Sequence, residues 1–341
     1  MPSPLPHRAT ILEVAREAGA SKTSVSRYFG GERERLSSAL QMRIAEAADR
    51  LGYLPNQMAR GLKGGRSRLI GMLVADIRNP FSVAVMHGVE QACRERGLSL
   101  LVCNTDNDPA QEREHLALLA AYRIQGLVIN AAGSPDRELQ MLVEQGIPLV
   151  LLDRELGDVN ADMVGLDNVQ AIDLALEHLQ AQGYRRLLYV SEPPAQASPR
   201  QARLERFRQG LTERGLVGET HCQSLTDSVA LEQAITTFLA GPATTPSALL
   251  CANGNVTLAV TRTLQALGTR LGETGLIGID ELDWCALVDS GITTLAQPTE
   301  AIGRAAVECL LAKPSPDGTS PALRRQHAPT LIARGSTLRS S

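Results

Sequence analysis

From residue 69 to residue 311 the sequence alternates between short apolar runs and segments with a helical pattern. The first set of apolar runs is LIGMLVA, LSLLVCN, GLVIN and PLVLLD, with helical segments at 81–96, 109–122 and 135–145. The second set is DMVGLD, RLLYVS, a strand near 221–225, ALLCA, LIGID and TTLAQ, with helices at 169–182, 199–214, 229–239, 255–267 and 300–311. Near-continuous apolar strands separated by helices predict parallel sheets covered on both faces. Two such sets predict an α/β core of two doubly wound parallel-sheet lobes.

A different pattern precedes this core. The segment TILEVAREAGASKTSVSRYF, residues 10–29, predicts two short helices joined by a tight turn. The apolar residues of the first helix recur at i, i+3, i+4 and i+7, and they are Ile11, Val14, Ala15 and Ala18. Gly19 stands where a helix end needs a left-handed residue, and Ser21 stands at the N-cap of a second helix over 22–29. Two such helices form a helix-turn-helix, whose second helix fits a DNA major groove. The alternative is an ordinary helical hairpin with a solvated second helix.

A third helix over 37–51 completes a small α-helical head of residues 10–52, and we expect residues 1–9 to form a disordered tail. Residues 1–68 carry twelve Lys or Arg and six Asp or Glu, a net charge of +6. Because the whole chain carries −3, the remainder carries −9. A basic head on an acidic body predicts a DNA-binding module attached to a domain that does not bind DNA.

We interpret residues 53–68 as a hinge. Pro55 suits the first turn of a short helix over 56–62, but this segment has too few apolar residues to be stable alone. We expect it to become helical only when it packs against something else. Leu62 is its one large apolar side chain, and a leucine inserted into a minor-groove base step kinks DNA. The alternative is a flexible linker.

Several classes of protein are disfavoured by what the sequence lacks. The six cysteines are scattered without a C-x-x-C pair, which favours reduced thiols over disulfides or a metal site. No apolar run approaches the ~18 residues of a membrane span and no signal-peptide pattern is visible, so we expect a cytoplasmic protein without a membrane partner. Because nucleotide-binding glycine loops, G-x-S-x-G and H-E-x-x-H are missing, we expect neither an enzyme nor a cofactor. An α/β enzyme and a sugar-binding receptor remain as rivals, which a DNA-binding measurement would separate.

Polar residues and one phenylalanine follow the predicted strands, at the edge where doubly wound sheets bind ligands. These candidates for an effector site are Asn79, Phe81, Asp153, Arg154, Asn253, Asp280 and Gln297, together with Arg203 early in the helix after RLLYVS. Each residue alone is more often a loop or cap residue. Together they favour a polar small molecule as the ligand.

The spacing of AREAGASKTSVSRYF, LGYLPNQMARGL and LIGMLVADIRNPF resembles the bacterial lac/gal repressor (LacI/GalR) family over essentially the whole chain. The resemblance implies a bilobed, periplasmic-binding-protein-like core that holds a sugar between lobes joined by three crossings of the chain. By that resemblance lobe 1 spans 69–166 and 297–325, and lobe 2 spans 167–296 and 326–335 of a core over 69–341. It also implies a repressor whose effector changes the angle between the lobes and the separation of the hinges. The effector would either release or promote DNA binding, and we expect release because most sugar sensors of the family are released.

The same resemblance assigns roles to pocket residues. Arg203 aligns with the family's pocket arginine, Asn253 and Asp280 with its sugar-binding pair, and Phe81 with its ring-stacking wall. Two positions depart from the family pattern, because Gly254 stands where Asp is frequent and Arg206 stands where Gly is frequent. These departures affect the details of hydroxyl recognition.

We assign the DNA contacts to the head and the hinge. Lys22, Thr23 and Arg27 are expected to contact base edges or their flanks, and Ser21 and Ser26 to contact phosphates. The remaining members of the expected interface are Thr10, Asn56, Ala59, Arg60 and Leu62. Because no leucine heptad is visible and two-fold operators need a two-fold protein, we expect a homodimer on double-stranded, pseudo-palindromic operator DNA.

The effector is the least constrained part of the prediction. The stretch IGIDELDWCALVDSGITTLAQP resembles the branch of the family that senses sugar acids such as gluconate and 2-ketogluconate. Trp284 would stack on the sugar or merely pack its lobe, and Arg203 would grip the carboxylate with help from Arg154. A neutral sugar and a purine are the alternatives, although a purine calls for more aromatic residues than this chain readily supplies.

Overall fold

The computed structural model describes residues 9–54, 67–130, 136–154, 161–242, 244–312 and 322–338. The chain divides into two compact units, a head up to Arg68 and a core from Leu69 onward. The expected tail at 1–9 lies almost wholly outside the described residues, and so does the helix expected over 56–62. No helix of the described part is both long enough and apolar enough to cross a membrane.

The head consists of three α-helices and one short 3-10 helix: α1 (Ile11–Glu17), α2 (Lys22–Gly30), η1 (Arg33–Arg35) and α3 (Ser38–Arg50). Thr10 begins α1 with a capping box, because its side chain accepts from the backbone of Glu13 while the Glu13 carboxylate accepts from the backbone of Thr10. Gly19 adopts a φ of +58° between the first two helices, which fits the tight turn. Fully buried apolar side chains, among them Val14, Val25 and Ile44, hold the helices together. The three predicted helices of the head are therefore confirmed.

Lobe 1 is built on a six-stranded parallel sheet in the order β11-β5-β4-β3-β1-β2. Its strands are β1 (Leu69–Val74), β2 (Ser99–Asn104), β3 (Gly126–Ile129), β4 (Leu149–Leu152), β5 (Asp162–Leu166) and β11 (Arg324–His327). Its helices are α5 (Pro80–Glu95), α6 (Pro109–Ala121), α7 (Asp136–Glu144) and α12 (Thr299–Leu311). The sequence pattern grouped β5 with the second set of strands, which is wrong, because β5 pairs with β4 and β11 in this sheet.

Lobe 2 has a second six-stranded sheet, in the order β12-β10-β9-β8-β6-β7, in which only β12 runs antiparallel. Its strands are β6 (Arg186–Ser191), β7 (Val217–Cys222), β8 (Ser247–Cys251), β9 (Gly275–Ile279), β10 (Thr293–Ala296) and β12 (Thr330–Ile332). Its helices are α8 (Asn168–Ala181), α9 (Ser198–Arg214), α10 (Ser228–Leu239) and α11 (Gly254–Ala266), with the 3-10 turns η2 (Pro194–Gln196) and η3 (Asp283–Ala286). The strand expected near 221–225 begins earlier, at Val217. This edge strand is polar and largely exposed, so it has no apolar pattern from which its start could be predicted.

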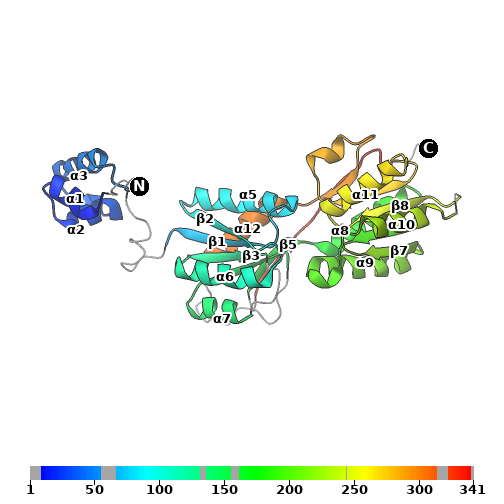
Figure 1. The fold of residues 1–341 in the computed structure, drawn as a ribbon, viewed down its shortest axis with the longest axis horizontal. Coiled ribbons are helices and arrows are strands. Elements are labelled where there is room, and N and C mark those ends of the chain that lie inside the picture. The colour runs from blue at the N-terminus through cyan, green and yellow to red at the C-terminus, as the bar shows by residue number, and fades with distance from the viewer. Residues whose placement is uncertain are drawn as a thin grey trace, which may run out of the picture. The chain divides into compact units, whose positions relative to one another are not determined.

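The chain crosses between the two lobes three times, after β5, after β10 and after β11. The second crossing returns α12 to lobe 1, where it packs against α5, so residues more than two hundred positions apart lie together (Figure 1). The third crossing falls after His327, two residues beyond the expected boundary at 325. Two doubly wound parallel-sheet lobes are therefore confirmed as the architecture of the core.

Candidate functional site

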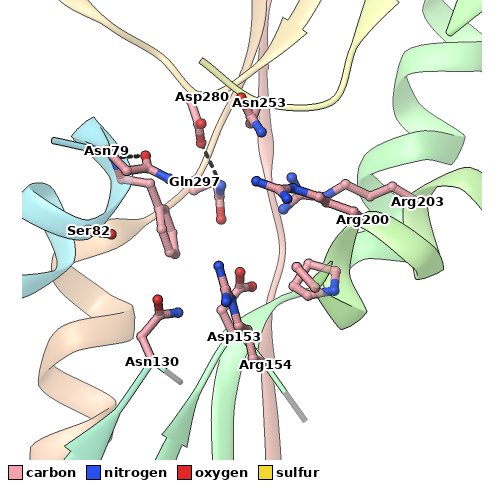
Figure 2. Close-up of a pocket in the computed structure, with 13 residues that line it drawn as sticks. Asn79, Ser82, Asn130, Asp153, Arg154, Arg200, Arg203, Asn253, Asp280 and Gln297 are labelled. Carbon is pink, nitrogen blue, oxygen red and sulfur yellow. Dashed lines mark hydrogen bonds between the residues drawn. The ribbon is translucent and has the colours of Figure 1, made fainter. Parts of the chain in front are cut away.

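A pocket between the two lobes, called here the interlobe pocket, collects side chains from the carboxyl ends of strands in both sheets (Figure 2). Eight of the nine residues expected to bind an effector line it: Asn79, Phe81, Asp153, Arg154, Arg203, Asn253, Asp280 and Gln297. The lining also includes five residues that were not among those predicted from the sequence: Ser82, Asn130, Ala197, Pro199 and Arg200.

Asp280 organises the lobe 2 side of the pocket. It follows β9 with a left-handed φ of +83°. One carboxylate oxygen accepts from the backbone N–H of Gly254 at 2.8 Å, and the other accepts from the side-chain amide of Gln297 at 2.6 Å. The Oε1 atom of Gln297 is buried and has no hydrogen-bond partner among the described residues. A ligand hydroxyl is the kind of donor that this oxygen lacks.

Arg203 lies on α9 with only 4% of its surface exposed. Its Nε donates to Oδ1 of Asn168 at 2.6 Å, and its Nη1 donates to the backbone oxygen of Ala252 at 2.6 Å. Both acceptors are neutral, so these bonds orient the guanidinium without neutralising its charge. A buried cation fixed in this way favours an anionic or strongly polar ligand.

Asn253 and Arg200 are tied together by a carboxylate just outside the pocket lining. Oε2 of Glu192 accepts from Nη2 of Arg200 at 2.6 Å and from Nδ2 of Asn253 at 2.8 Å. The other side-chain atom of Asn253, Oδ1, accepts from the backbone of Val256 and caps α11. Both pocket residues are therefore held in fixed orientations by lobe 2 itself.

The lobe 1 side of the pocket carries a pair of opposite charges, Asp153 and Arg154, directly after β4. Burial raises the pKa of Asp153, against the lowering effect of the positive charges on Arg203 and Arg154. Oδ1 of Asp153 is buried without a partner among the described residues. This oxygen is a second acceptor that a ligand hydroxyl would satisfy.

Asn79, Phe81 and Asn130 complete the wall from lobe 1. Asn79 caps α5, with Oδ1 accepting from the backbone of Phe81 at 3.1 Å, and the Phe81 side chain lines the pocket. Asn130 directly follows β3, and its Nδ2 donates to the backbone oxygen of Leu152. Because Asn130 ends the run GLVIN, the rule that selected the other strand-end residues would also have selected it.

Trp284 is the one expected effector residue that does not line the pocket. Residues 283–286 form η3, and the indole packs against the hydrophobic cluster of lobe 2 that contains Val256, Cys285 and Ile292. Of the two roles left open for Trp284, the structure favours packing within its own lobe over stacking on a sugar, because the turn after Leu282 directs the side chain into that lobe.

The two departures from the family pattern have structural explanations. A Cβ atom at Gly254 would lie 2.7 Å from the side chain of Leu282, so any larger residue would require a shift there. Arg206 lies outside the pocket lining and pairs with Asp173 and Glu213 at 2.6 Å each. These pairs raise the pKa of Arg206, first through the hydrogen bond to Glu213.

The candidate DNA-binding surface lies on α2 of the head. Lys22, Thr23 and Arg27 are exposed, and Ser26 is half-buried on the same helix. Ser21 caps α2, with Oγ accepting from the backbone of Ser24 at 3.0 Å, as Thr10 caps α1. The hinge residues assigned to the interface, namely Asn56, Ala59, Arg60 and Leu62, lie outside the described residues.

Comparisons with known proteins match both parts of the chain. Residues 10–56 match the model of bacterial regulatory proteins of the lacI family, and residues 67–327 match that of periplasmic binding proteins and the sugar binding domain of the LacI family. The HTH-type transcriptional regulator PtxS of Pseudomonas putida is 52% identical, over 97% of this chain and 96% of the relative. This chain belongs to the LacI family.

Two further similar proteins share less of the sequence. The HTH-type transcriptional regulator KdgR of Bacillus subtilis is 37% identical, over 92% of this chain and 93% of its own length. The lac repressor dimer bound to operator and the anti-inducer ONPF shares the fold, with a TM-score of 0.82 and 21% identity over 97% of this chain and all of that one. LacI-family membership makes the chain a transcriptional regulator and removes the enzyme from the rival classes.

Proposed function

We propose that this LacI-family protein is a transcriptional repressor that binds a pseudo-palindromic operator as a homodimer and is released by a small sugar acid. Two full-length relatives, PtxS and KdgR, are named as HTH-type transcriptional regulators, and a structure with the same fold is a dimer on its operator. Acting on DNA, the protein would work in the cytoplasm.

The observation that carries the choice of effector is the set of three arginines, Arg154, Arg200 and Arg203, in one interlobe pocket. A sugar acid offers a carboxylate to guanidinium groups and hydroxyls to the remaining polar residues. Asp280 and Asn253, with the buried oxygens of Asp153 and Gln297, supply the hydrogen-bonding partners for those hydroxyls. A neutral sugar would satisfy the hydroxyl contacts but would leave the arginines without an anionic ligand.

The proposed mechanism couples this pocket to DNA through the hinge at 53–68. Lys22, Thr23 and Arg27 read or flank the bases, and paired hinge segments with Leu62 enter the minor groove. Effector binding favours one angle between the lobes, changes the separation of the hinges and lowers operator affinity. This is a population shift, because the effector and the operator prefer different states of one protein.

A gel-shift experiment tests the proposal. The purified protein is bound to an operator fragment that it has itself selected from random DNA, and then titrated with gluconate, 2-ketogluconate, glucose, ribose and guanine. Release by an acid and not by glucose, ribose or guanine is expected, and Arg203→Gln should remove the response while operator binding persists. Release by ribose or guanine, with no response to either acid, would overturn the effector class and leave the repressor standing.

A further inference from the structure

Two arginines reach the interlobe pocket from opposite lobes. Arg154 follows β4 of lobe 1, whereas Arg200 lies in the first turn of α9 of lobe 2. Figure 2 shows both guanidinium groups pointing into the same cavity, with Arg203 beside Arg200. A ligand group bound by both arginines would therefore connect the two lobes directly.

Arg203 is less suited to bidentate hydrogen bonding with a carboxylate than we expected from the sequence. Its Nε already donates to Asn168 and its Nη1 to the backbone of Ala252. The side-on fork of Nε and Nη2, one of the faces with which arginine holds a carboxylate, is thus closed. Both acceptors also belong to lobe 2, so a carboxylate on Arg203 alone would not link the lobes.

The electrostatics of Arg154 indicate that an anion is favoured between the two arginines. Burial is the first cause that lowers the pKa of Arg154, and the positive charge of Arg200 is the second. The carboxylates of Asp153, Glu112 and Glu192 act in the opposite direction. Two cations that repel each other across a cavity are stabilised by a single carboxylate placed between them.

Glu192 supplies the negative charge for Arg200 in the structure. Its Oε2 accepts from Arg200 at 2.6 Å and from Asn253 at 2.8 Å, with 15% of the Arg200 side chain and 23% of the Glu192 side chain exposed. Glu192 thereby orients two pocket residues, but its charge also opposes the arrival of a second carboxylate at Arg200. The hydrogen bonds of Glu192 should raise the affinity for an acidic ligand, whereas its negative charge should lower that affinity.

We propose that Arg154 and Arg200 form the carboxylate subsite of the interlobe pocket, that the bound carboxylate bridges the lobes, and that Glu192 positions Arg200 while competing for it. This inference rests on the proposed sugar-acid effector and names the residues that distinguish an acid from a neutral sugar. Arg203, Asn253 and Asp280 then hold the hydroxyl-bearing part of the ligand. A carboxylate bound to both lobes would directly favour one angle between them, whereas a neutral sugar has no carboxylate to form this bridge.

Calorimetric titration of the full-length protein with gluconate, 2-ketogluconate and glucose tests the subsite. Arg200→Gln and Arg154→Gln should each weaken acid binding by about 10- to 100-fold, the range for lost charge-assisted hydrogen bonds. Because both arginines hold the same carboxylate, the double variant should lose much less than the product of the two single losses. Arg206→Gln is the matched control on the same helix, since Arg206 pairs outside the pocket, and it should bind the acids as the wild type does.

Glu192→Gln gives a test of opposite sign. Glutamine keeps an oxygen that accepts from Arg200 and Asn253 but removes the competing charge, so acid binding should become several-fold tighter, while Glu192→Ala should weaken it by releasing both residues. If the wild type binds an acid and either Arg200→Gln or Arg154→Gln binds it with the same affinity, the proposed subsite is wrong but the effector class stands. Weaker acid binding in Glu192→Gln would overturn the competing role of Glu192. Failure of the wild type to bind either acid would overturn the effector class and the subsite together.

Discussion

Asp280 and Gln297 join the ends of β9 and β10 through a hydrogen bond of 2.6 Å, at the point where the chain leaves lobe 2 for lobe 1. The second carboxylate oxygen of Asp280 accepts from the backbone of Gly254, so one side chain fixes two neighbouring segments of the pocket. Gln297 contributes its amide N–H to this bond and retains a buried Oε1 without a described partner. Because of this arrangement, replacing Asp280 by alanine and replacing it by asparagine should lower the free energy of unfolding by different amounts.

We expect Asp280→Ala to lower the free energy of unfolding of the core by about 1–3 kcal/mol, because it leaves two donors without acceptors. Asp280→Asn should cost clearly less. Asparagine keeps one oxygen for Gly254, and a flip of the Gln297 amide turns its unpaired Oε1 toward the new N–H group. Urea unfolding followed by circular dichroism measures both variants, and equal losses would contradict the flip.

The contact between α5 and α12 predicts a second stability effect. A Cβ atom at Gly303 would lie 2.6 Å from the backbone of both Val85 and Val89, and one at Gly88 would lie 2.8 Å from the backbone of Glu300. Gly303→Ala should therefore force the helices apart and cost about 1–3 kcal/mol of unfolding free energy. Ala301→Ser, on the exposed side of α12, is the control for a small change in the same helix. A Gly303→Ala variant as stable as the control would show that the helices separate without cost.

Much of the fold was predictable because it depends on local patterns. The alternation of apolar runs and helices determines the parallel sheets, and Ser21 and Gly19 act as the cap and turn that their residue types favour. Most of the predicted pocket residues follow from one topological rule, because carboxyl ends of parallel strands meet at one edge. Asn130 obeys the same rule although it was not selected.

What was not predictable depends on side-chain direction and on partners distant in sequence. Arg200 enters the pocket because α9 presents it beside Arg203, and its role depends on Glu192, which follows a different element. The strand β11, with the sequence RRQH, lacks an apolar pattern and is fixed by its pairing with β5. Trp284 turns into its lobe because η3 intervenes after Asp280, a local change that spacing alone does not reveal.

The position of Trp284 leads to a third prediction. Because the indole packs against the lobe 2 cluster and does not line the pocket, Trp284→Phe should change acid affinity by no more than about twofold. Phenylalanine retains most of the apolar contact, so the core should remain folded. Calorimetric titration with gluconate and 2-ketogluconate measures the effect, and a tenfold loss would restore the stacking role.

His178 predicts a dependence of stability on pH. Its Nε2 lies 2.7 Å from Oγ1 of Thr337, and burial lowers its pKa below the ordinary value of 6.5. Below pH 6.5 the unfolded chain binds a proton at His178 more readily than the folded chain does. The contribution of His178 to the free energy of unfolding is therefore fully present above that pH and is lost as the pH falls. The contribution cannot exceed about 1.4 kcal/mol per pH unit for one group.

His178→Gln isolates this contribution, since glutamine can still bond to Thr337 and does not titrate. Between pH 7.5 and 5.5 the variant should lose less unfolding free energy than the wild type does. Part of the dependence should persist, because burial also lowers the pKa of His221 and His327. Identical pH profiles of urea unfolding for variant and wild type would exclude His178 as a source.

Arg27 provides the test of the DNA-reading surface. The side chain is exposed on α2, the second helix of the helix-turn-helix, one turn after Thr23. Arg27→Ala should reduce affinity for the selected operator by about 1–3 kcal/mol if the side chain contacts a base edge, and should reduce discrimination against unrelated DNA. A residue that contacts only phosphate would instead lower both affinities alike and reduce the salt dependence by about one unit. Gel shifts on operator and unrelated DNA at several salt concentrations separate these outcomes, while unchanged titrations with gluconate or 2-ketogluconate show that the pocket is intact. Operator affinity equal to the wild type at every salt concentration would remove Arg27 from the interface.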